Sequence, residues 1–360
     1  MSGRCRLGAQ RILILALLLG VGCSDDDGTT NPSLESSWHA MLAPTGSILD
    51  LATDGTFLYA AGGWGGSEET DLAARWDGVA WQSLGRVTAS GAKAIALYGG
   101  TPVVGGWFQT LGDEPLAYLV VRSSTDWLPL GGGVSGPVEA LLADAGDLYI
   151  GGFFYEAGGL EARSVSHWDG SAYHALGAGL NGPVYSLALF RGELVAAGSF
   201  LRSGEDTVRN IAAWDGSAWH PLGAGTDGDV RALATYGDEL IAGGTFAHAG
   251  GVAANSIARW DGTAWQPLGP GLTSAGGGEQ GVHDLTVFQG DLIAGGIFDL
   301  AGASYVHNIA RWDGTAWDDL DVGVNGTVRA LVVFGPDLIV GGLFDVAGGT
   351  TVDEIARWGR

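Results

Sequence analysis

The side chains best suited to chemistry occupy one position that recurs along the sequence, directly after the first apolar residue of a predicted strand. In chain order this position holds Leu49, Lys93, Glu139, Tyr185, Arg231, His283 and Arg329. Lys93 is the only lysine of the chain, and the last three members offer arginine, histidine and arginine from successive repeats. Because cationic side chains bind carboxylates and other anions, we predict a site for an anion or a sugar acid.

The predicted ligand-binding site consists of Lys93, Glu139, Tyr185, Arg231, His283 and Arg329. If the repeats close into a ring, these positions lie near the mouth of its central channel. The alternative is that they are tolerant positions whose charges pair with neighbouring acids. The formal net charge of the chain is −23, which argues against nucleic acid as a partner because phosphate binding needs a positive surface.

Internal repeats must position this site, and each is marked by one aromatic residue. The series is Trp38, Trp81, Trp127, Tyr173, Trp219, Trp265 and Trp317, with spacings between 43 and 52 residues. A complete unit, such as 229–269, holds four apolar runs of strand length separated by turn signals. Four strands in each of seven units predict an all-β fold, a seven-bladed β-propeller with four antiparallel strands per blade.

The two ends of the repeat region each hold part of one unit. The last unit reaches its third strand at 354–358 and has no fourth, whereas residues 36–42 match a fourth strand and have no first three. We therefore predict that the N-terminal strand closes the last blade. Such closure leaves no unpaired edge between the first and last blades.

Glycine marks the predicted turns and close contacts. Asp-Gly pairs begin at Asp77, Asp169, Asp215, Asp261 and Asp313, between the third and fourth strands. This pair favours two-residue hairpins with positive φ, which we predict here. Gly-Gly pairs in the second strand, such as 243–244, predict close backbone approach where the blades crowd together.

A second recurring position, at the start of the second strand, is acidic. It holds Asp147, Glu193, Glu239, Asp291 and Asp337. One interpretation is contact with calcium or a basic protein, and the other is turn chemistry together with solubility. The histidines are His39, His167, His174, His220, His248, His283 and His307. No two of them have metal-ligand spacing, so we predict neither a metal nor a cofactor.

The N-terminal segment differs in composition from the repeats. Three arginines precede an apolar run over 12–21 that is too short to span a bilayer and is typical of an export signal. We predict a signal peptide over 1–22, a lipidated Cys23 opening a flexible tether over 23–35, and one propeller over 36–360. The stretch "LGVGC" resembles a bacterial lipobox but has Gly20 where leucine is usual, so cleavage with release of the protein is the alternative. The expected location is the bacterial cell envelope.

The repeats resemble those of kelch-type propellers, and also those of bacterial surface propellers and the fungal Rax2 cortical-marker family. The likeness rests on "LIAGGTF" followed by "IARWDGTAWQPLG" within 240–269, and it covers 36–360. It implies a propeller and says little about activity. Galactose oxidase, an enzyme with a kelch-type propeller, crosslinks a cysteine to a tyrosine beside its copper. The two cysteines here, Cys5 and Cys23, both precede the repeats, so no such crosslink is expected.

These features favour a monomeric binding or scaffolding module at the cell envelope, with an unknown protein or glycan as its ligand. The alternative is a carbohydrate-active enzyme, a lyase or a hydrolase, with its site at the same channel mouth. A lyase would need a base beside a carboxylate-binding arginine, roles for which Arg231, His283 and Arg329 would serve. A purely structural surface protein is a third possibility.

Overall fold

The computed structural model describes residues 36–41, 46–64, 70–87, 91–108, 110–111, 114–115, 117–275 and 280–359. These belong to one compact unit, Ser36–Arg360. The regular secondary structure of the described residues consists of β-strands. Among the residues described, no helix has the length and apolar character needed to cross a membrane. The predicted signal peptide, Cys23 and the tether lie outside the described residues.

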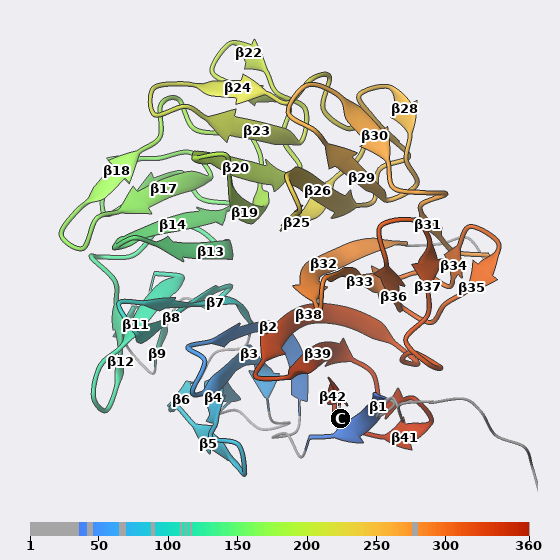
Figure 1. The fold of residues 1–360 in the computed structure, drawn as a ribbon. Coiled ribbons are helices and arrows are strands. Elements are labelled where there is room, and N and C mark those ends of the chain that lie inside the picture. The colour runs from blue at the N-terminus through green and yellow to red at the C-terminus, as the bar shows by residue number, and fades with distance from the viewer. Residues whose placement is uncertain are drawn as a thin grey trace, which may run out of the picture. The chain divides into compact units, whose positions relative to one another are not determined.

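Seven antiparallel sheets, each with a path of four strands, make up the described part of the unit (Figure 1). Sheet 1 contains β2 (Gly46–Thr53), β3 (Leu58–Trp64), β4 (Thr70–Trp76) and β5 (Trp81–Ser83), with β6 (Arg86–Val87) pairing β4. Sheet 2 contains β7 (Ala92–Tyr98), β8 (Thr101–Gly106), β11 (Leu119–Arg122) and β12 (Trp127–Pro129). Sheet 3 contains β13 (Val138–Asp144), β14 (Asp147–Gly152), β17 (Val165–Trp168) and β18 (Tyr173–Ala175).

The remaining sheets repeat this meander, and the last also includes the first strand of the chain. Sheet 4 contains β19 (Val184–Phe190), β20 (Glu193–Gly198), β23 (Ile211–Trp214) and β24 (Trp219–Pro221). Sheet 5 contains β25 (Val230–Tyr236), β26 (Glu239–Gly244), β29 (Ile257–Trp260) and β30 (Trp265–Pro267). Sheet 6 contains β32 (Gly281–Phe288), β33 (Asp291–Ile297), β36 (Ile309–Trp312) and β37 (Trp317–Asp318). Sheet 7 contains β38 (Thr327–Phe334), β39 (Asp337–Leu343), β42 (Ile355–Gly359) and β1 (Ser37–Ala40).

Short hairpins connect the second and third strands of sheets 2 to 7. They are β9 (Thr110–Leu111) with β10 (Glu114–Pro115), β15 (Glu156–Ala157) with β16 (Leu160–Glu161), and β21 (Arg202–Ser203) with β22 (Asp206–Thr207). The others are β27 (His248–Ala249) with β28 (Val252–Ala253), β34 (Leu300–Ala301) with β35 (Ser304–Tyr305), and β40 (Val346–Ala347) with β41 (Thr350–Thr351). In sheet 6 the hairpin also pairs with β31 (Leu272–Thr273). The predicted long loops are therefore partly ordered into strands.

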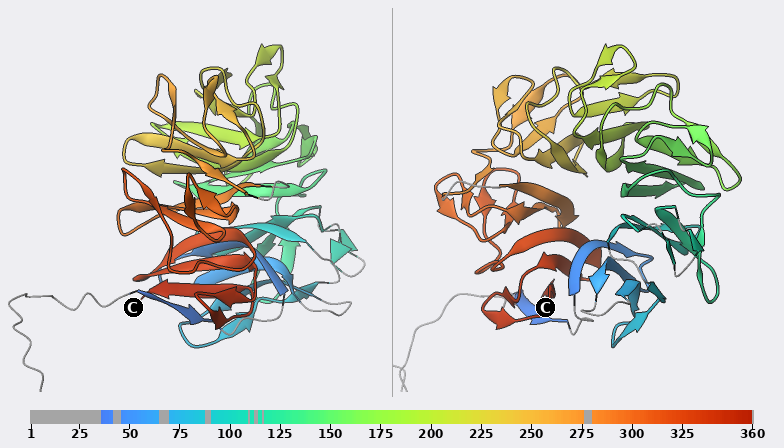
Figure 2. Two further views of the ribbon diagram at one scale, coloured as in Figure 1. Left: turned by 90° about the vertical axis from the view of Figure 1, so that its right-hand side faces the viewer. Right: turned by 180° about the vertical axis from the view of Figure 1, so that it is seen from behind.

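The first strand of each sheet is innermost, and these strands pack against one another in sequence. β2 contacts β7, the contacts continue through β13, β19, β25 and β32 to β38, and β38 contacts β2 again. Views from opposite sides show the sheets of this unit set around a common centre (Figure 1, Figure 2). The prediction of an all-β fold of antiparallel four-stranded sheets is confirmed.

Five of the seven sheets pack on the next sheet by placing a β-branched side chain against a glycine, at Gly105, Gly151, Gly243, Gly295 and Gly341. β3 and β20 have Ala61 and Ala197 at the same register position. A Cβ on Gly151 of β14 would lie 2.6 Å from Val184 Cγ1 of β19, closer than such atoms approach one another. Gly341 of β39 faces Ile48 of β2 in the same way, so the last sheet packs on the first as the others pack on their neighbours. The predicted close approach at the Gly-Gly pairs is confirmed. A side chain on the first glycine would overlap the next sheet, and a side chain on the second, as at Gly152, would overlap the backbone of the inner strand of its own sheet.

In sheets 4 to 7, the recurring tryptophan of the outermost strand forms a hydrogen bond to the preceding sheet. Trp265 Nε1 donates a hydrogen bond to the Leu222 carbonyl at 2.8 Å. Trp38 Nε1, from β1, donates to the Leu320 carbonyl at 3.1 Å, and β1 pairs with β42 along its whole length. Both indole rings are buried. The N-terminal strand therefore makes the same contacts as an outermost strand that follows its own sheet in the chain.

The turns between the third and fourth strands are longer than predicted. Trp260 pairs with Trp265, so four residues connect the strands, and the prediction of two-residue hairpins is wrong. Asp261 Oδ1 accepts the backbone N–H groups of Thr263 and Ala264, at 2.7 and 2.9 Å. The carboxylate caps the loop from within, which stabilises a longer turn than the Asp-Gly pair alone suggests.

Two aspartates on inner strands link neighbouring sheets near the centre. Asp50 of β2 accepts the Ile95 N–H from β7 at 2.7 Å, and Asp284 of β32 accepts the Leu331 N–H from β38 at 2.6 Å. Burial raises the pKa of Asp50 to about 7. Burial and the nearby charge of Asp50 raise the pKa of Asp284 to about 8.

Replacing Trp38 by alanine should destabilise the protein as much as replacing Trp265, by about 3 to 5 kcal/mol, because both side chains are buried and make the same bond. Trp38→Phe should cost only about 1 kcal/mol beyond the change in packing, since it removes the hydrogen bond and keeps most of the ring. Denaturant unfolding of the three variants measures these differences. A Trp38→Ala protein as stable as the wild type would show that β1 is not an integral strand.

The two raised aspartate pKa values predict that stability falls as pH rises. Both groups bind a proton more tightly in the folded protein than in the unfolded chain, so this stabilisation is complete below about pH 4 and is lost through about pH 8. The slope is up to about 1.4 kcal/mol per pH unit for each carboxyl group. Melting temperatures across this range should fall less steeply for an Asp50→Asn, Asp284→Asn variant than for the wild type. Equal slopes would contradict the assignment.

Candidate functional site

The structure brings all six predicted site residues together. Lys93, Glu139, Tyr185, Arg231, His283 and Arg329, with Leu49, line one cavity of about 280 Å³. Each residue comes from the innermost strand of a different sheet. We refer to this cavity as the channel mouth.

Every residue of the channel mouth occupies a β-bulge. The ladder between β25 and β26 passes from Val230 directly to Ala232, so Arg231 has no residue opposite it. The ladder between β32 and β33 omits His283 in the same way, between Val282 and Asp284. A bulge frees its extra residue from the alternation of the strand, which allows the side chain to turn toward the channel. Sequence reasoning found the position through its variability and did not predict the bulge.

The electrostatics of the mouth centre on His283. Arg231 Nη1 lies 3.1 Å from His283 Nε2. Because a guanidinium only donates hydrogen bonds, Nε2 must accept this one and carry no proton. Burial, followed by the positive charges of Arg329 and Arg231, lowers the pKa of His283 to about 3. The imidazole is therefore neutral near pH 7, between two cationic side chains.

On another part of the mouth, a tryptophan forms a hydrogen bond to Glu139, the one carboxylate among the seven lining residues. Trp107 Nε1 donates a hydrogen bond to Glu139 Oε1 at 2.5 Å, and the Trp107 side chain is 55% exposed. Burial raises the pKa of Glu139, while the Trp107 bond and the charge of Lys93 act in the opposite direction. Sequence reasoning missed Trp107. The sequence feature that could have identified Trp107 is its position directly after the Gly-Gly pair of β8. This end of β8 lies beside the bulge of β7.

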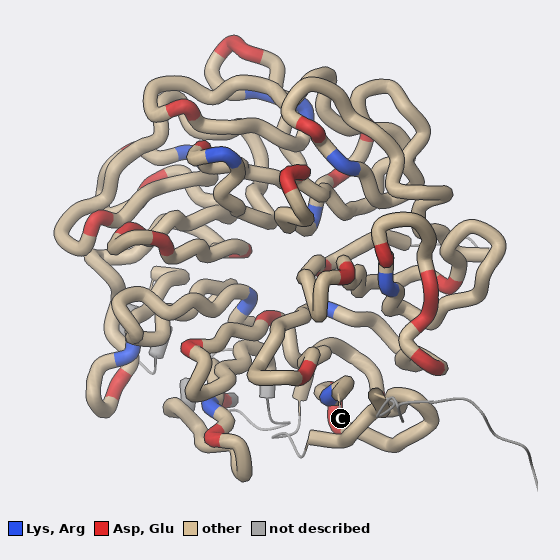
Figure 3. The backbone as a smooth tube through the Cα atoms, viewed as in Figure 1, with Lys and Arg blue, Asp and Glu red and all other residues tan. Residues whose placement is uncertain are grey.

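The mouth carries more positive than negative charge. Lys93, Arg231 and Arg329 are opposed within the ring by Glu139 alone, in a protein of net charge −23. Figure 3 shows both blue and red segments near the centre, and further red segments over the periphery. A site of this kind concentrates anions against the overall charge of the protein.

A second cavity of about 170 Å³ adjoins the mouth and shares all seven of its residues. Its lining adds Asp50 and Asp284, the carboxyl groups that link neighbouring inner strands. Burial raises the pKa of Tyr185, so its hydroxyl keeps its proton at neutral pH and can donate a hydrogen bond. The mouth thus adjoins a cavity lined by two carboxyl groups, Asp50 and Asp284, that become neutral on protonation.

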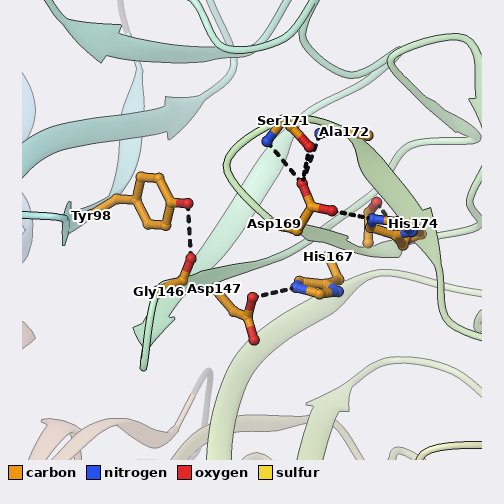
Figure 4. A network of polar contacts seen from close by, with 9 residues as sticks. Tyr98, Gly146, Asp147, His167, Asp169, Ser171, Ala172 and His174 are labelled. Carbon is orange, nitrogen blue, oxygen red and sulfur yellow. Dashed lines mark hydrogen bonds and ion pairs between the residues drawn. The ribbon is translucent and has the colours of Figure 1, made fainter.

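The recurring acidic residues of the second strand form ion pairs within their own sheets. Glu239 pairs with Arg259 at 3.2 Å, and Asp147 pairs with His167 at 2.9 Å. Figure 4 shows Asp147 with His167 and, beside them, Asp169 with His174. These pairs favour the structural interpretation over a calcium site. Within the described ranges, no group of three or more His, Cys, Asp or Glu residues is placed to hold a metal ion.

Comparisons with known proteins identify the fold. No family model matches the chain, and no curated protein matches it. The WD40 β-propeller domain of Doa1 is 13% identical, with a TM-score of 0.56 over 90% of this chain and 96% of that one. YCF48, solved bound to D1 peptide, is 17% identical, with a TM-score of 0.56 over 90% and 97%. The computationally designed Ika8 protein is 15% identical, with a TM-score of 0.51 over 89% and 98%. The chain folds as a β-propeller.

Proposed function

We propose that this protein is a binding module whose channel mouth holds the anionic group of a protein or glycan ligand. The observation that carries the proposal is the convergence of Lys93, Arg231 and Arg329, from three separate sheets, on one cavity of about 280 Å³. Guanidinium and ammonium groups placed in advance around a cavity bind a carboxylate, sulfate or phosphate with little loss of side-chain entropy.

The scaffold for this site is a seven-bladed propeller with kelch-like repeats. Each of the seven sheets is one blade, and β1 closes the last. The pairing of β1 with β42 and the bond from Trp38 to the Leu320 carbonyl support this closure. A closed ring fixes the spacing of the inner strands, and this spacing sets the distances between the cations.

The surroundings of the mouth suit a ligand larger than a single ion. The Trp107 ring is half exposed and is tied to Glu139, so it offers a flat apolar surface at the mouth for a sugar ring or a peptide side chain. YCF48, which has a similar fold, was solved with a peptide bound. This precedent supports a protein-binding role for the present chain.

We also propose export to the bacterial cell envelope and a lipid anchor on Cys23. The support is the sequence of the first 23 residues, with arginines before a short apolar run and a lipobox-like ending. The tether over 23–35 would let the propeller stand away from the membrane, with the mouth free to meet soluble or surface-bound ligands.

A binding role is favoured over the carbohydrate lyase because of His283. A general base works best with a pKa near the operating pH, and the pKa of His283 is lowered to about 3. While Nε2 accepts the hydrogen bond from Arg231, it has no free lone pair with which to remove a proton from carbon. The arrangement stabilises a bound negative charge better than it activates a base.

Calorimetry of the propeller with an oligosaccharide of uronic acids and with an acidic peptide tests the proposal, and a neutral oligosaccharide provides the comparison. An Arg231→Ala, Arg329→Ala variant should bind the acidic ligand at least about 100-fold more weakly, since each hydrogen bond to a charged group contributes about 1.5 to 3 kcal/mol.

The matched control is Arg202→Ala, Arg209→Ala, which removes the same charge from exposed residues that do not line the channel mouth. This control should bind nearly as the wild type does. If both double variants weakened binding equally, the effect would come from net charge, and the mouth would not be the site.

A further inference from the structure

In the channel mouth, His283 and a bound anion would compete for the same hydrogen-bond donor, the guanidinium of Arg231. The imidazole Nε2 accepts a hydrogen bond from Arg231 at 3.1 Å, and the same guanidinium lines the cavity where an anion would bind. An anion is a stronger acceptor than a neutral imidazole, because hydrogen bonds to an ionised acceptor are about twice as strong. An anion that enters the mouth therefore competes with Nε2 for the Arg231 N–H group.

Once Arg231 turns to the anion, Nε2 no longer accepts its hydrogen bond, and the proton affinity of Nε2 rises. The positive charges that oppose an imidazolium at this place belong to Arg329 and Arg231, after burial the largest causes of the low His283 pKa. A bound anion cancels part of both charges and also offers an acceptor for a new N–H group. Opposite charge within a few ångströms favours the charged form of a titratable group.

The Asp229 carboxylate acts on Tyr185 of the mouth. The charged and titratable groups that line the two cavities also bear on this step. They are Arg231 on β25, Arg329 on β38, Lys93 on β7, Glu139 on β13, Tyr185 on β19, Asp50 on β2, and Asp284 on the strand of His283 itself. The first three are cations that the anion would neutralise in part. The two aspartates lie in the adjoining cavity, and their titration must be separated from that of His283.

We propose that the channel mouth binds an anion together with one proton, which is taken up from solvent by Nε2 of His283 when Arg231 turns to the ligand. His283 is thereby a specificity-determining residue. This inference rests on the proposed function, since it needs an anion in the mouth. No covalent bond forms except the new N–H bond, and the imidazolium then donates a hydrogen bond to the anion.

The class of ligand follows from the charge of the mouth. Three cations opposed by Glu139 already favour more than one negative charge, and a protonated His283 adds a further positive charge. The site should therefore prefer an anion with two charges, such as a sulfate ester with a second acid nearby, a phosphate monoester or a dicarboxylate, over a single carboxylate. By linkage, an anion that raises the affinity for a proton binds more tightly as pH falls.

Inorganic sulfate is the probe that isolates this effect, because it stays doubly charged from about pH 8 to about pH 5 and its own titration does not interfere. Calorimetry with the wild-type propeller should show that sulfate binds more tightly as the pH is lowered. The Kd should decrease by up to about tenfold for each pH unit. The Asp50→Asn, Asp284→Asn variant removes the titration of both carboxyl groups in the adjoining cavity, and its Kd should still depend on pH. Adding His283→Gln to that variant should abolish the remaining dependence. Acetate, with one charge, should bind more weakly throughout.

Proton resonances of the imidazole provide a second readout. In the wild type near pH 5.5, His283 should appear protonated with saturating sulfate and neutral without it. No sulfate binding at any pH would contradict the proposed anion site itself. Sulfate binding whose pH dependence is lost in the aspartate variant, or persists after His283→Gln is added to it, would leave the anion site standing and overturn the role of His283. Binding without pH dependence would do the same.

Discussion

The contact between a glycine of one sheet and a β-branched residue of the next is the constraint on which the rest of the structure depends. Gly151 against Val184, and Gly341 against Ile48, allow the second strand of one sheet to approach the inner strand of the next more closely than any side chain would permit. The same contact joins the last sheet to the first, and the inner strands contact one another all the way around. The bulge on each inner strand then turns one side chain per sheet toward the centre, and these side chains line the cavity there.

The charge of the site follows from this geometry. Acidic residues at the periphery interact with groups close by. Asp261 caps a turn, and Glu239 forms an ion pair with Arg259. The inner strands instead bring cations together where burial and mutual repulsion prevent His283 from ionising. A strongly acidic protein thus has a positive mouth, where a bound anion would offset the repulsion between the gathered cations.

Much of this organisation could be predicted from the sequence because repetition exposes it. The spacing of the tryptophans indicated the sheets, and the variability of the position at Arg231 and His283 identified the lining of the mouth. Local turn rules failed at Asp261, since the capping bonds of a carboxylate depend on a loop geometry that the Asp-Gly pair does not specify. Trp107 was missed because its recurring position, directly after the Gly-Gly pair, does not by itself reveal a bond to Glu139 of the next sheet.

The central claim is that the channel mouth is an anion site, and the most direct measurement is a crystal structure of the propeller soaked with selenate, an anomalous scatterer that mimics sulfate. The account predicts an anomalous peak in the mouth, within hydrogen-bond distance of Arg231 and Arg329, at concentrations that saturate binding in solution. An empty mouth under those conditions, with selenate bound elsewhere on the protein, would contradict it.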